Sequence, residues 1–435
     1  MDVTIEGIKG KNIRGSVSVP GDKSNTHRGI VLGSIAEGVT IINNFLDSLD
    51  CKNTIACMQS LGIQIKKTVH RGNFIEIQGK GLTGLQEPNN ILQAGNSGTT
   101  IRLLAGLLSG QKFNSILDGD DSTRKRPMQR IIQPLSMMGA QIKGTNQTDF
   151  APLSITGVQL QGINYTLPVA SAQVKSAILL ASLFARGETV IYEPVTTRDH
   201  TERMLALMQA DIQSITTPEK KITIKPGKKL KGSYINIPGD FSSASYFIAL
   251  VCAREGAEII VKNVGINPTR TGFLTVLKEM GANITLLNKK IISNEPVADI
   301  KVNGSSLRGI SIDKKVIPSI IDELPLMAVI ATQAKGKTIV KGAQELRVKE
   351  TDRIKAIVKE LAKMGANILE NEDGFEIMGP TDLRGDTLNS YFDHRIAMSL
   401  VVAASYAGGK TVIGQRECIN ISYPDFLKSY FKLIA

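Results

Sequence analysis

The sequence predicts an α/β protein of two domains built from six βαβαββ repeats. Six apolar segments of helical length each end near a glycine, and a β-rich run follows every glycine. These glycines recur about every 72 residues, which is one sixth of the 435-residue chain. We expect them to end six helices: Gly38, Gly110, Gly187, Gly256, Gly336 and Gly408.

A second helix is predicted in each repeat. Five of these helices close on related phrases, such as LSMMGAQI and LAKMGANI, and the sixth, YPDFLKSYFKLIA, ends the sequence. A pair of strands separated by glycines should follow, as in IEIQGKGLTG and IKVNGSSLRG. Five such pairs occur after helices, and VTIEGIKGKNIRG near the N-terminus has the same form. We therefore expect the N-terminal strands to complete the sixth repeat.

Two Pro-Gly-Asp turns divide the six repeats into two groups of three. VPGD ends at Asp22 and IPGD ends at Asp240, and each turn precedes one of the apolar helices. We expect one domain over residues 22–239 and the other over residues 1–21 plus 240–435. The two turns would be neighbouring crossings between the domains and would form a hinge.

Composition and charge narrow the possible functions. The longest apolar runs are too short to cross a bilayer, and the N-terminus lacks the pattern of a secretory signal, so we expect a cytoplasmic protein without a membrane partner. Four dispersed cysteines lack zinc-site or disulfide spacing. The net charge of +12 fits nucleic acid or small anions. Aromatic residues are only 5% and the basic residues are dispersed, which favours small anionic substrates.

Basic residues at helix starts point to anion binding. Ser, Thr, Asp and Asn there are ordinary caps, and this explains Ser242 and Ser243. A cation at the same place is opposed by the helix macrodipole unless an anion is bound. Such cations precede or open both kinds of helix: Lys23, Arg28, Arg395, Arg126, Arg198, Arg270 and Arg353. With hinged domains, the anions would lie in the cleft between them.

The stretch VPGDKSNTHR is not a nucleotide phosphate loop, because Asp22 stands where that motif needs glycine. Three acidic positions are candidates for proton transfer, although capping and ion pairing explain them equally well: Asp322, Glu323 and the group Glu350–Asp352. Three histidines lie inside the basic motifs and are expected to be structural: His27, His200 and His394.

Eight motifs, in chain order, resemble the 5-enolpyruvylshikimate-3-phosphate synthase family from end to end: PGDKSNTHR, GNSGTTIR, RKRP, SAQVKSAILL, RDHTE, NPTR, KETDR and DHRIAM. The related UDP-N-acetylglucosamine enolpyruvyl transferases share the two-domain fold. They typically carry a cysteine before the RP dipeptide, where this chain has DGDDSTRKRP, and they lack KETDR. The resemblance implies two inside-out α/β barrels with three repeats in each.

The resemblance also implies a reaction. The enolpyruvyl group of phosphoenolpyruvate would pass to the 5-hydroxyl of shikimate 3-phosphate by addition and elimination, with release of phosphate, in aromatic amino-acid biosynthesis. No metal or organic cofactor would take part, and we expect a monomer. Two alternatives remain at this point: a nucleic-acid-binding or RNA-end-processing protein built on the same repeat, and a UDP-N-acetylglucosamine enolpyruvyl transferase.

By motif position, the resemblance implies the residues that bind each substrate. Those for phosphoenolpyruvate would be Lys23, Asn96, Gly98, Arg126, Gln173, Arg353 and Arg395. Those for shikimate 3-phosphate would be Lys23, Ser24, Arg28, Ser171, Ala172, Gln173, Lys175, Arg198, Asp322 and Lys349. Asp322 would take the hydroxyl proton, Glu350 would exchange a proton at the methylene carbon, and Lys23 would assist either step.

The motifs also bear on the inhibitor glyphosate and on one contact with phosphate. GDKS, SAQVK, RDHTE and NPTR resemble the class II members of the family, many of which tolerate glyphosate. Some tolerant members have alanine at the position of Gly98, which this chain keeps as glycine. Many members carry a lysine just before the aromatic-Pro-Asp near the C-terminus, where this chain has Ile421 and Ser422.

Overall fold

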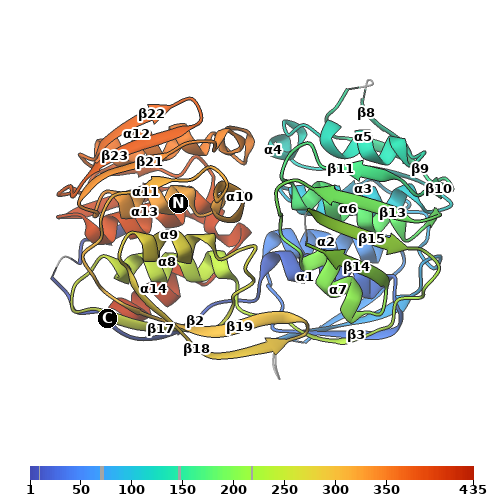
Figure 1. The fold of residues 1–435 in the computed structure, drawn as a ribbon, viewed down its shortest axis with the longest axis horizontal. Helices are drawn as coiled ribbons and strands as arrows, with labels where there is room; N and C mark the ends of the chain where they lie inside the picture. The colour runs from blue at the N-terminus through green and yellow to red at the C-terminus, as the bar shows by residue number, and fades with distance from the viewer. Residues whose placement is uncertain (9, 69–72, 146–147, 217–218) are drawn as a thin grey trace. The chain divides into compact units, whose positions relative to one another are not determined.

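The chain folds into two units, each built from three repeats (Figure 1). The computed structural model describes residues 1–8, 10–68, 73–145, 148–216 and 219–435. Unit 1 comprises Met1–Pro20, Pro238–Ile291 and Pro296–Ala435. Unit 2 comprises Gly21–Ile237 and Ile292–Glu295.

The two unit boundaries lie within two residues of those expected from the sequence, and one further segment differs. Ile292–Glu295 belongs to unit 2, although residues on both sides of it belong to unit 1. Three contacts account for this placement. Asn294 and Arg203 each donate a hydrogen bond to the other's backbone carbonyl, at 3.0 Å in both cases, and Asn236 N donates to Ser293 Oγ at 2.8 Å.

The three repeats of unit 2 follow one another along the chain. The first contains α1 (Lys23–Ser34), β3 (Glu37–Asn43), α2 (Leu49–Ser60), β4 (Gln64–Thr68) and β5 (Phe74–Lys80). The second contains β6 (Leu92–Gln93), α3 (Gly98–Ser109), β7 (Asn114–Asp118), α4 (Asp121–Arg124), α5 (Gln129–Met137), β8 (Gln141–Gly144) and β9 (Leu153–Thr156). The third contains β10 (Leu160–Gln161), β11 (Asn164–Thr166), α6 (Ala172–Ser182), β12 (Ala185–Arg186), β13 (Thr189–Glu193), α7 (His200–Leu207), β14 (Asp211–Ile215), β15 (Lys220–Lys225) and β16 (Tyr234–Asn236).

Unit 1 holds the other three repeats. The fourth contains β2 (Arg14–Ser18), α8 (Phe241–Cys252), β17 (Glu258–Gly265), α9 (Gly272–Glu279), β18 (Asn283–Ile292) and β19 (Glu295–Asn303). The fifth contains β20 (Ser311–Ile312), α10 (Ile317–Ile320), α11 (Leu324–Ala331), β21 (Gly336–Val340), η2 (Gln344–Val348), α12 (Arg353–Lys363), β22 (Asn367–Asn371) and β23 (Gly374–Gly379). The sixth contains β24 (Thr387–Asn389), α13 (His394–Tyr406), β25 (Lys410–Gly414), η3 (Arg416–Ile421), α14 (Phe426–Ile434) and β1 (Val3–Glu6).

Each repeat contributes one sheet of the same design, although β16, at the end of the third repeat, pairs parallel with β3 and completes the sheet of the first repeat. In β20-β21-β23-β22 the first two strands are parallel, and the hairpin strands β23 and β22 follow antiparallel. The sixth sheet, β1-β25-β24, has three strands, and β1 pairs antiparallel with β25. The prediction that the N-terminus completes the sixth repeat is confirmed for β1. It is wrong for β2, which pairs with β17 of the fourth repeat.

Two local predictions need correction. In four of the expected pairs the second strand is reduced to β10 or to an isolated bridge, such as Arg308 with Lys335 and Arg384 with Gly408. Of the six glycines, Gly110 caps its helix, whereas the others lie beyond the helix end. Gly38, for example, lies inside β3 with φ +86°, a left-handed conformation that favours glycine. Most of these glycines therefore serve the turn into the strand.

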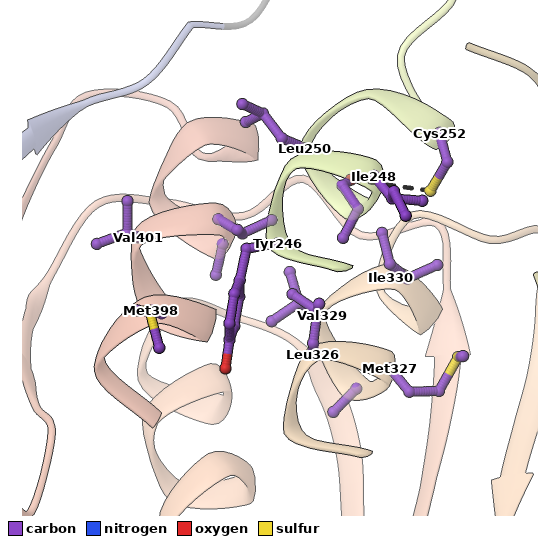
Figure 2. Close-up of a cluster of buried hydrophobic side chains, with 14 of the residues drawn as sticks. Tyr246, Ile248, Leu250, Cys252, Leu326, Met327, Val329, Ile330, Met398 and Val401 are labelled. Atoms are coloured by element: carbon purple, nitrogen blue, oxygen red, sulfur yellow. Dashed lines mark hydrogen bonds between the residues drawn. The ribbon is translucent and has the colours of Figure 1, made fainter. Parts of the chain in front are cut away.

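The first helices of the repeats form the centre of each unit. Every residue of α8, α11 and α13 is buried, as expected of helices that are apolar on all sides. Figure 2 shows where these helices meet in unit 1, with side chains that include Tyr246, Val329 and Met398. Helices α1, α3 and α6 supply the corresponding core of unit 2. The helices lie inside and the sheets outside, which makes each unit an inside-out α/β barrel and places the starts of the central helices close together.

Candidate active site

Lys23 is the first residue of α1. Asp22 caps the helix by accepting a hydrogen bond from Asn25 N at 2.7 Å. The ammonium of Lys23 lies 3.0 Å from Asp50 Oδ2, on α2. Its side chain stays 20% exposed, so the charge remains accessible to a ligand.

Arg28 lies one turn further along α1 and is buried. Its Nε donates to Thr201 Oγ1 at 2.6 Å, its Nη2 to Ser176 Oγ at 2.9 Å and its Nη1 to Ser24 O at 2.9 Å. Burial lowers the pKa of Arg28 to about 10, and the positive charge of Arg198 adds to this effect. Two cations predicted to bind shikimate 3-phosphate therefore lie within electrostatic range of each other, as expected of a site for an anion.

The start of α3 brings together three residues predicted to bind phosphoenolpyruvate. Arg126 donates from Nη2 to Asn96 Oδ1 at 2.9 Å and from Nη1 to Asn96 O at 3.2 Å. A Cβ on Gly98 would lie only 3.1 Å from Arg126 Nη1 and 2.8 Å from Nη1 of a further arginine, Arg102. Glycine at this position thus leaves room for two guanidinium groups.

Arg102 is a residue that the sequence-based reasoning missed. It is buried, and its Nη1 donates to Gln173 Oε1 at 2.5 Å and to Gly98 O at 3.3 Å. The amide nitrogen of Gln173, Nε2, donates to Thr99 Oγ1 at 3.0 Å. Arg102 follows Gly98 by four residues, so helical periodicity could have placed it on the same face.

The start of α6 carries the remaining candidates of this unit. Ser171 caps the helix by accepting from Val174 N at 3.4 Å. Ser171, Ala172 and Gln173 are half-buried, as are Ser24, Asn96 and Arg198. Side chains of this group are partly accessible, which suits residues that contact a substrate.

Lys175, which was predicted to lie near the phosphate of shikimate 3-phosphate, is enclosed by carboxylates. Its side chain is fully buried, and its Nζ lies 2.6 Å from Glu202 Oε1 and 3.0 Å from Glu193 Oε1. Lys220 Nζ lies 3.0 Å from Glu193 Oε2 and 3.7 Å from Glu202 Oε1. The charge of Lys175 is therefore used inside a group of two lysines and two glutamates.

In unit 1, three arginines surround Asp322. The distances from its carboxylate oxygens are 3.5 Å to Arg270 Nη1, 3.7 Å to Arg353 Nη1 and 3.6 Å to Arg395 Nη2. The side chain of Asp322 is 15% exposed. Arg270 carries the same helix-start signal as the other arginines, but the motif assignment left it out of the site.

Arg353 and Arg395 are held by further carboxylates. Arg353 Nε lies 2.7 Å from Asp393 Oδ2, and Arg353 Nη2 lies 2.5 Å from Glu350 Oε2. Although burial opposes it, the negative charges of Asp393 and Glu350 raise the pKa of Arg353 above its ordinary value. Arg395 Nη1 donates to Asp322 O at 3.1 Å. Both guanidinium groups are therefore fixed in position and remain charged.

Ser242 is not the helix cap that the sequence predicted. Asp240 caps α8 by accepting from Ser243 N at 2.7 Å. Ser242 Oγ instead donates to Glu323 and accepts from Arg270 Nη2 at 2.7 Å. The hydroxyl therefore links the Glu323 carboxylate to the Arg270 guanidinium beside Asp322.

Lys349 and Glu350 precede α12 and are half-buried. Burial lowers the pKa of Lys349 below its ordinary value, whereas the charge of Asp322 opposes this shift. The electrostatic influence of Asp322 places Lys349 near the same cluster.

The three histidines of the basic motifs are buried. His27 Nδ1 lies 2.7 Å from Thr54 Oγ1, and Thr54 bonds Thr100, so this chain of contacts joins α1, α2 and α3. His200 Nδ1 lies 2.7 Å from Glu295 Oε1. Among the described residues, no group of three or more His, Cys, Asp or Glu side chains is placed to hold a metal ion.

The similarity of this chain to known proteins extends over nearly its whole length. A family model described as EPSP synthase (3-phosphoshikimate 1-carboxyvinyltransferase) matches residues 8–430. The chain belongs to the EPSP synthase family. A 3-phosphoshikimate 1-carboxyvinyltransferase from Thermoanaerobacter sp. (strain X514) is 52% identical over 430 residues, which are 99% of each chain. One from Petrotoga mobilis is 49% identical over 433 residues, again 99% of each.

Solved structures agree with this membership. An EPSP synthase from Acinetobacter baumannii superposes with a TM-score of 0.88 at 43% identity, covering 99% of this chain and 98% of the other. The enolpyruvyl transferase NikO from Streptomyces tendae has a TM-score of 0.78 at 16% identity, covering 99% and 96%, and shares the fold. The family resemblance expected from the motifs is confirmed, and it favours the synthase over both alternatives.

In the described part of the chain, no helix has the length and apolar character needed to span a membrane.

Proposed function

We propose that this EPSP synthase family member performs the family's reaction with the two clusters described above. The enolpyruvyl group of phosphoenolpyruvate is transferred to the 5-hydroxyl of shikimate 3-phosphate, and inorganic phosphate is released. Both substrates are polyanions, carrying phosphate and carboxylate groups, so their binding requires concentrated positive charge.

Unit 2 would bind mainly shikimate 3-phosphate. Lys23, Ser24, Arg28 and Arg198 are candidates for its phosphate and carboxylate, and the start of α6 adds polar contacts. Lys349 and Asp322 of unit 1 complete the predicted set. We now assign Lys175 to the support of α6 and α7, because Glu193 and Glu202 enclose its ammonium.

Residues assigned to phosphoenolpyruvate are divided between the two units. Lys23, Asn96, Gly98, Arg126 and Gln173 belong to unit 2, and Arg353 and Arg395 belong to unit 1. We propose that turnover requires both sets. Unit 1 also carries the acids, so its role would be to complete the phosphoenolpyruvate site and to move protons.

The chemistry requires two proton transfers in the addition step and one in the elimination step. In the addition, the hydroxyl oxygen bonds to C2 of phosphoenolpyruvate, Asp322 accepts the hydroxyl proton, and a proton is delivered to the methylene carbon to form a methyl group. In the elimination, a methyl proton leaves, the C–O bond to phosphate breaks, and phosphate departs. Glu350 is the proposed partner of the methyl carbon, and Lys23 assists.

The observation that carries this proposal is the group of three guanidinium groups within 4 Å of the Asp322 carboxylate. Its distances to Arg270, Arg353 and Arg395 lie between 3.5 and 3.7 Å. Such a group combines fixed positive charge for a departing phosphate with a carboxylate for a hydroxyl proton. Each guanidinium is itself held, so little reorganisation is needed during the reaction.

Proton NMR of the reaction mixture tests the proposal. With both substrates, two vinyl protons of an enol ether on the 5-oxygen of shikimate 3-phosphate should appear, and in D₂O deuterium should enter that vinyl group. A folded protein that forms no such product would contradict the proposal. Binding of RNA or DNA with a steep salt dependence, in place of this product, would favour a nucleic-acid partner.

We also propose that the chain acts as a cytoplasmic monomer on small-molecule anions, without a nucleic-acid or membrane partner, and that it belongs to the class II group of the family. Class II membership predicts tolerance to glyphosate. Strong inhibition by low micromolar glyphosate at near-saturating phosphoenolpyruvate would argue against tolerance.

A further inference from the structure

The turn before α13 has an uncommon conformation for its sequence. Asp393 N donates to Ser390 O at 2.9 Å, and both residues between them, Tyr391 and Phe392, have positive φ, 54° and 56°. A four-residue turn with positive φ at both central positions is of type I′, which normally uses Asn and Gly. Large aromatic residues adopt this conformation only when other contacts enforce it.

Glu360 supplies those contacts. This residue of α12 is fully buried, and its Oε1 accepts a hydrogen bond from the Tyr391 hydroxyl at 2.6 Å. Its Oε2 accepts from Asn389 N at 2.9 Å and from Lys363 Nζ at 2.8 Å. The Asn389 side chain in turn accepts from Tyr391 N at 2.6 Å. One carboxylate therefore binds both the strand end and the first aromatic residue of the turn.

The turn leads directly into the cluster around Asp322. Asp393, its last residue, binds Arg353 Nε at 2.7 Å and accepts from Arg395 N at 2.8 Å. Arg353 and Glu360 lie seven residues apart on α12, so they occupy the same face, two turns from each other. Helix α12 thus contacts the segment before α13 at two places, through Arg353 and through Glu360.

We infer that Glu360 and Tyr391 are positioning residues for the phosphoenolpyruvate side of the site. They hold the type I′ turn, the turn fixes Asp393, and Asp393 fixes Arg353 and the start of α13 that carries Arg395. Neither Glu360 nor Tyr391 is assigned a contact with substrate. This inference rests on the proposed function for its kinetic readout.

The test compares Tyr391→Phe and Glu360→Gln with the unmodified enzyme. Tyr391→Phe removes one hydrogen bond to the buried Glu360 carboxylate, whereas Glu360→Gln removes its charge and one of the two oxygens that accept the three hydrogen bonds. In both variants KM for phosphoenolpyruvate should rise about tenfold. KM for shikimate 3-phosphate should stay within twofold, since most of its predicted contacts lie on other elements. Tyr430→Phe is the matched control, because it removes a tyrosine hydroxyl that bonds Ser405 Oγ at 2.7 Å, far along α13 from Arg395.

A rescue separates positioning from general destabilisation. Tyr391→Asn with Phe392→Gly supplies residues that favour a type I′ turn, so adding this pair to Glu360→Gln should return KM for phosphoenolpyruvate to within threefold of the unmodified value. Amide hydrogen exchange of residues 390–396 should accelerate in Glu360→Gln and slow again in the rescued variant, a readout that does not require turnover.

The outcomes are distinct. If the unmodified enzyme forms no product, the proposed function fails, and hydrogen exchange alone decides the inference. If the enzyme is active and neither variant changes KM for phosphoenolpyruvate or hydrogen exchange, the inference is wrong. An equal rise in both KM values, or no rescue by the turn replacement, would also overturn it.

Discussion

Replacing Lys175 with methionine tests whether this lysine supports the fold or binds substrate. Methionine keeps most of the side-chain volume but leaves the buried carboxylates of Glu193 and Glu202 facing Lys220, from which they lie 3.0 and 3.7 Å away. Those glutamates, outweighing burial, raise the pKa of Lys220 above its ordinary value, so it stays charged. Removing one partner of a buried ion pair costs about 3–5 kcal/mol of unfolding free energy.

Urea unfolding followed by circular dichroism measures that loss. Lys225→Met is the control, because Lys225 is exposed and lies 3.8 Å from Glu188, and its unfolding curve should be unchanged. Adding Glu202→Gln to Lys175→Met restores the charge balance and should recover roughly 2 kcal/mol. Full stability of Lys175→Met together with a raised KM for shikimate 3-phosphate would refute the reasoning and return Lys175 to the substrate site.

Three further predictions concern single residues. Gly98→Ala places a Cβ 2.8 Å from Arg102 Nη1 and 3.1 Å from Arg126 Nη1. In steady-state assays KM for phosphoenolpyruvate should therefore rise about tenfold, while KM for shikimate 3-phosphate stays unchanged. Equal changes in the two KM values would contradict this prediction. Burial, then two cationic neighbours, lowers the pKa of His27 well below 6.5. The unfolded chain therefore binds a proton that the native state does not, and stability should fall below pH 6.5 by up to about 1.4 kcal/mol per pH unit. His27→Gln should lack this pH dependence. If urea unfolding gives the same slope of unfolding free energy against pH for the variant and the unmodified protein, His27 is not its source. Asp322→Asn should lower kcat at least about 100-fold with its circular dichroism unchanged, and a near-normal kcat would remove its role as a base.

The repeat architecture could be predicted because periodicity and glycine spacing are local properties. Apolar helices and β-rich runs recur six times, and the described residues contain six corresponding sheets beside the small sheet of β10 and β12. Strand partners are not local, and for that reason β2 was assigned to the wrong sheet. The glycines were misplaced because the same residue suits a helix cap and a left-handed turn into a strand, as Gly38 shows.

The candidate site could be predicted in part. Cations at helix starts identified Lys23, Arg353 and Arg395, because the helix dipole disfavours them without an anion. Contacts between distant segments were missed. Ser242 lies 81 residues from Glu323 in sequence, and only the packing of α8 beside α11 shows that its hydroxyl bonds that carboxylate.

The enclosure of Lys175 was missed for a related reason. Its motif gives no sign of Glu193 and Glu202, which come from β13 and α7. A lysine beside polar helix-start residues resembles a ligand contact in sequence, whereas its burial depends on the whole unit.

Phosphate release tests the central claim most directly. Purified protein should release inorganic phosphate from phosphoenolpyruvate only when shikimate 3-phosphate is present, with one equivalent of phosphate for each enol ether formed. The rate should persist with a chelator, and Arg353→Lys should reduce it strongly while the protein stays folded. No phosphate release by folded protein with both substrates, or release that does not depend on shikimate 3-phosphate, would contradict the assignment.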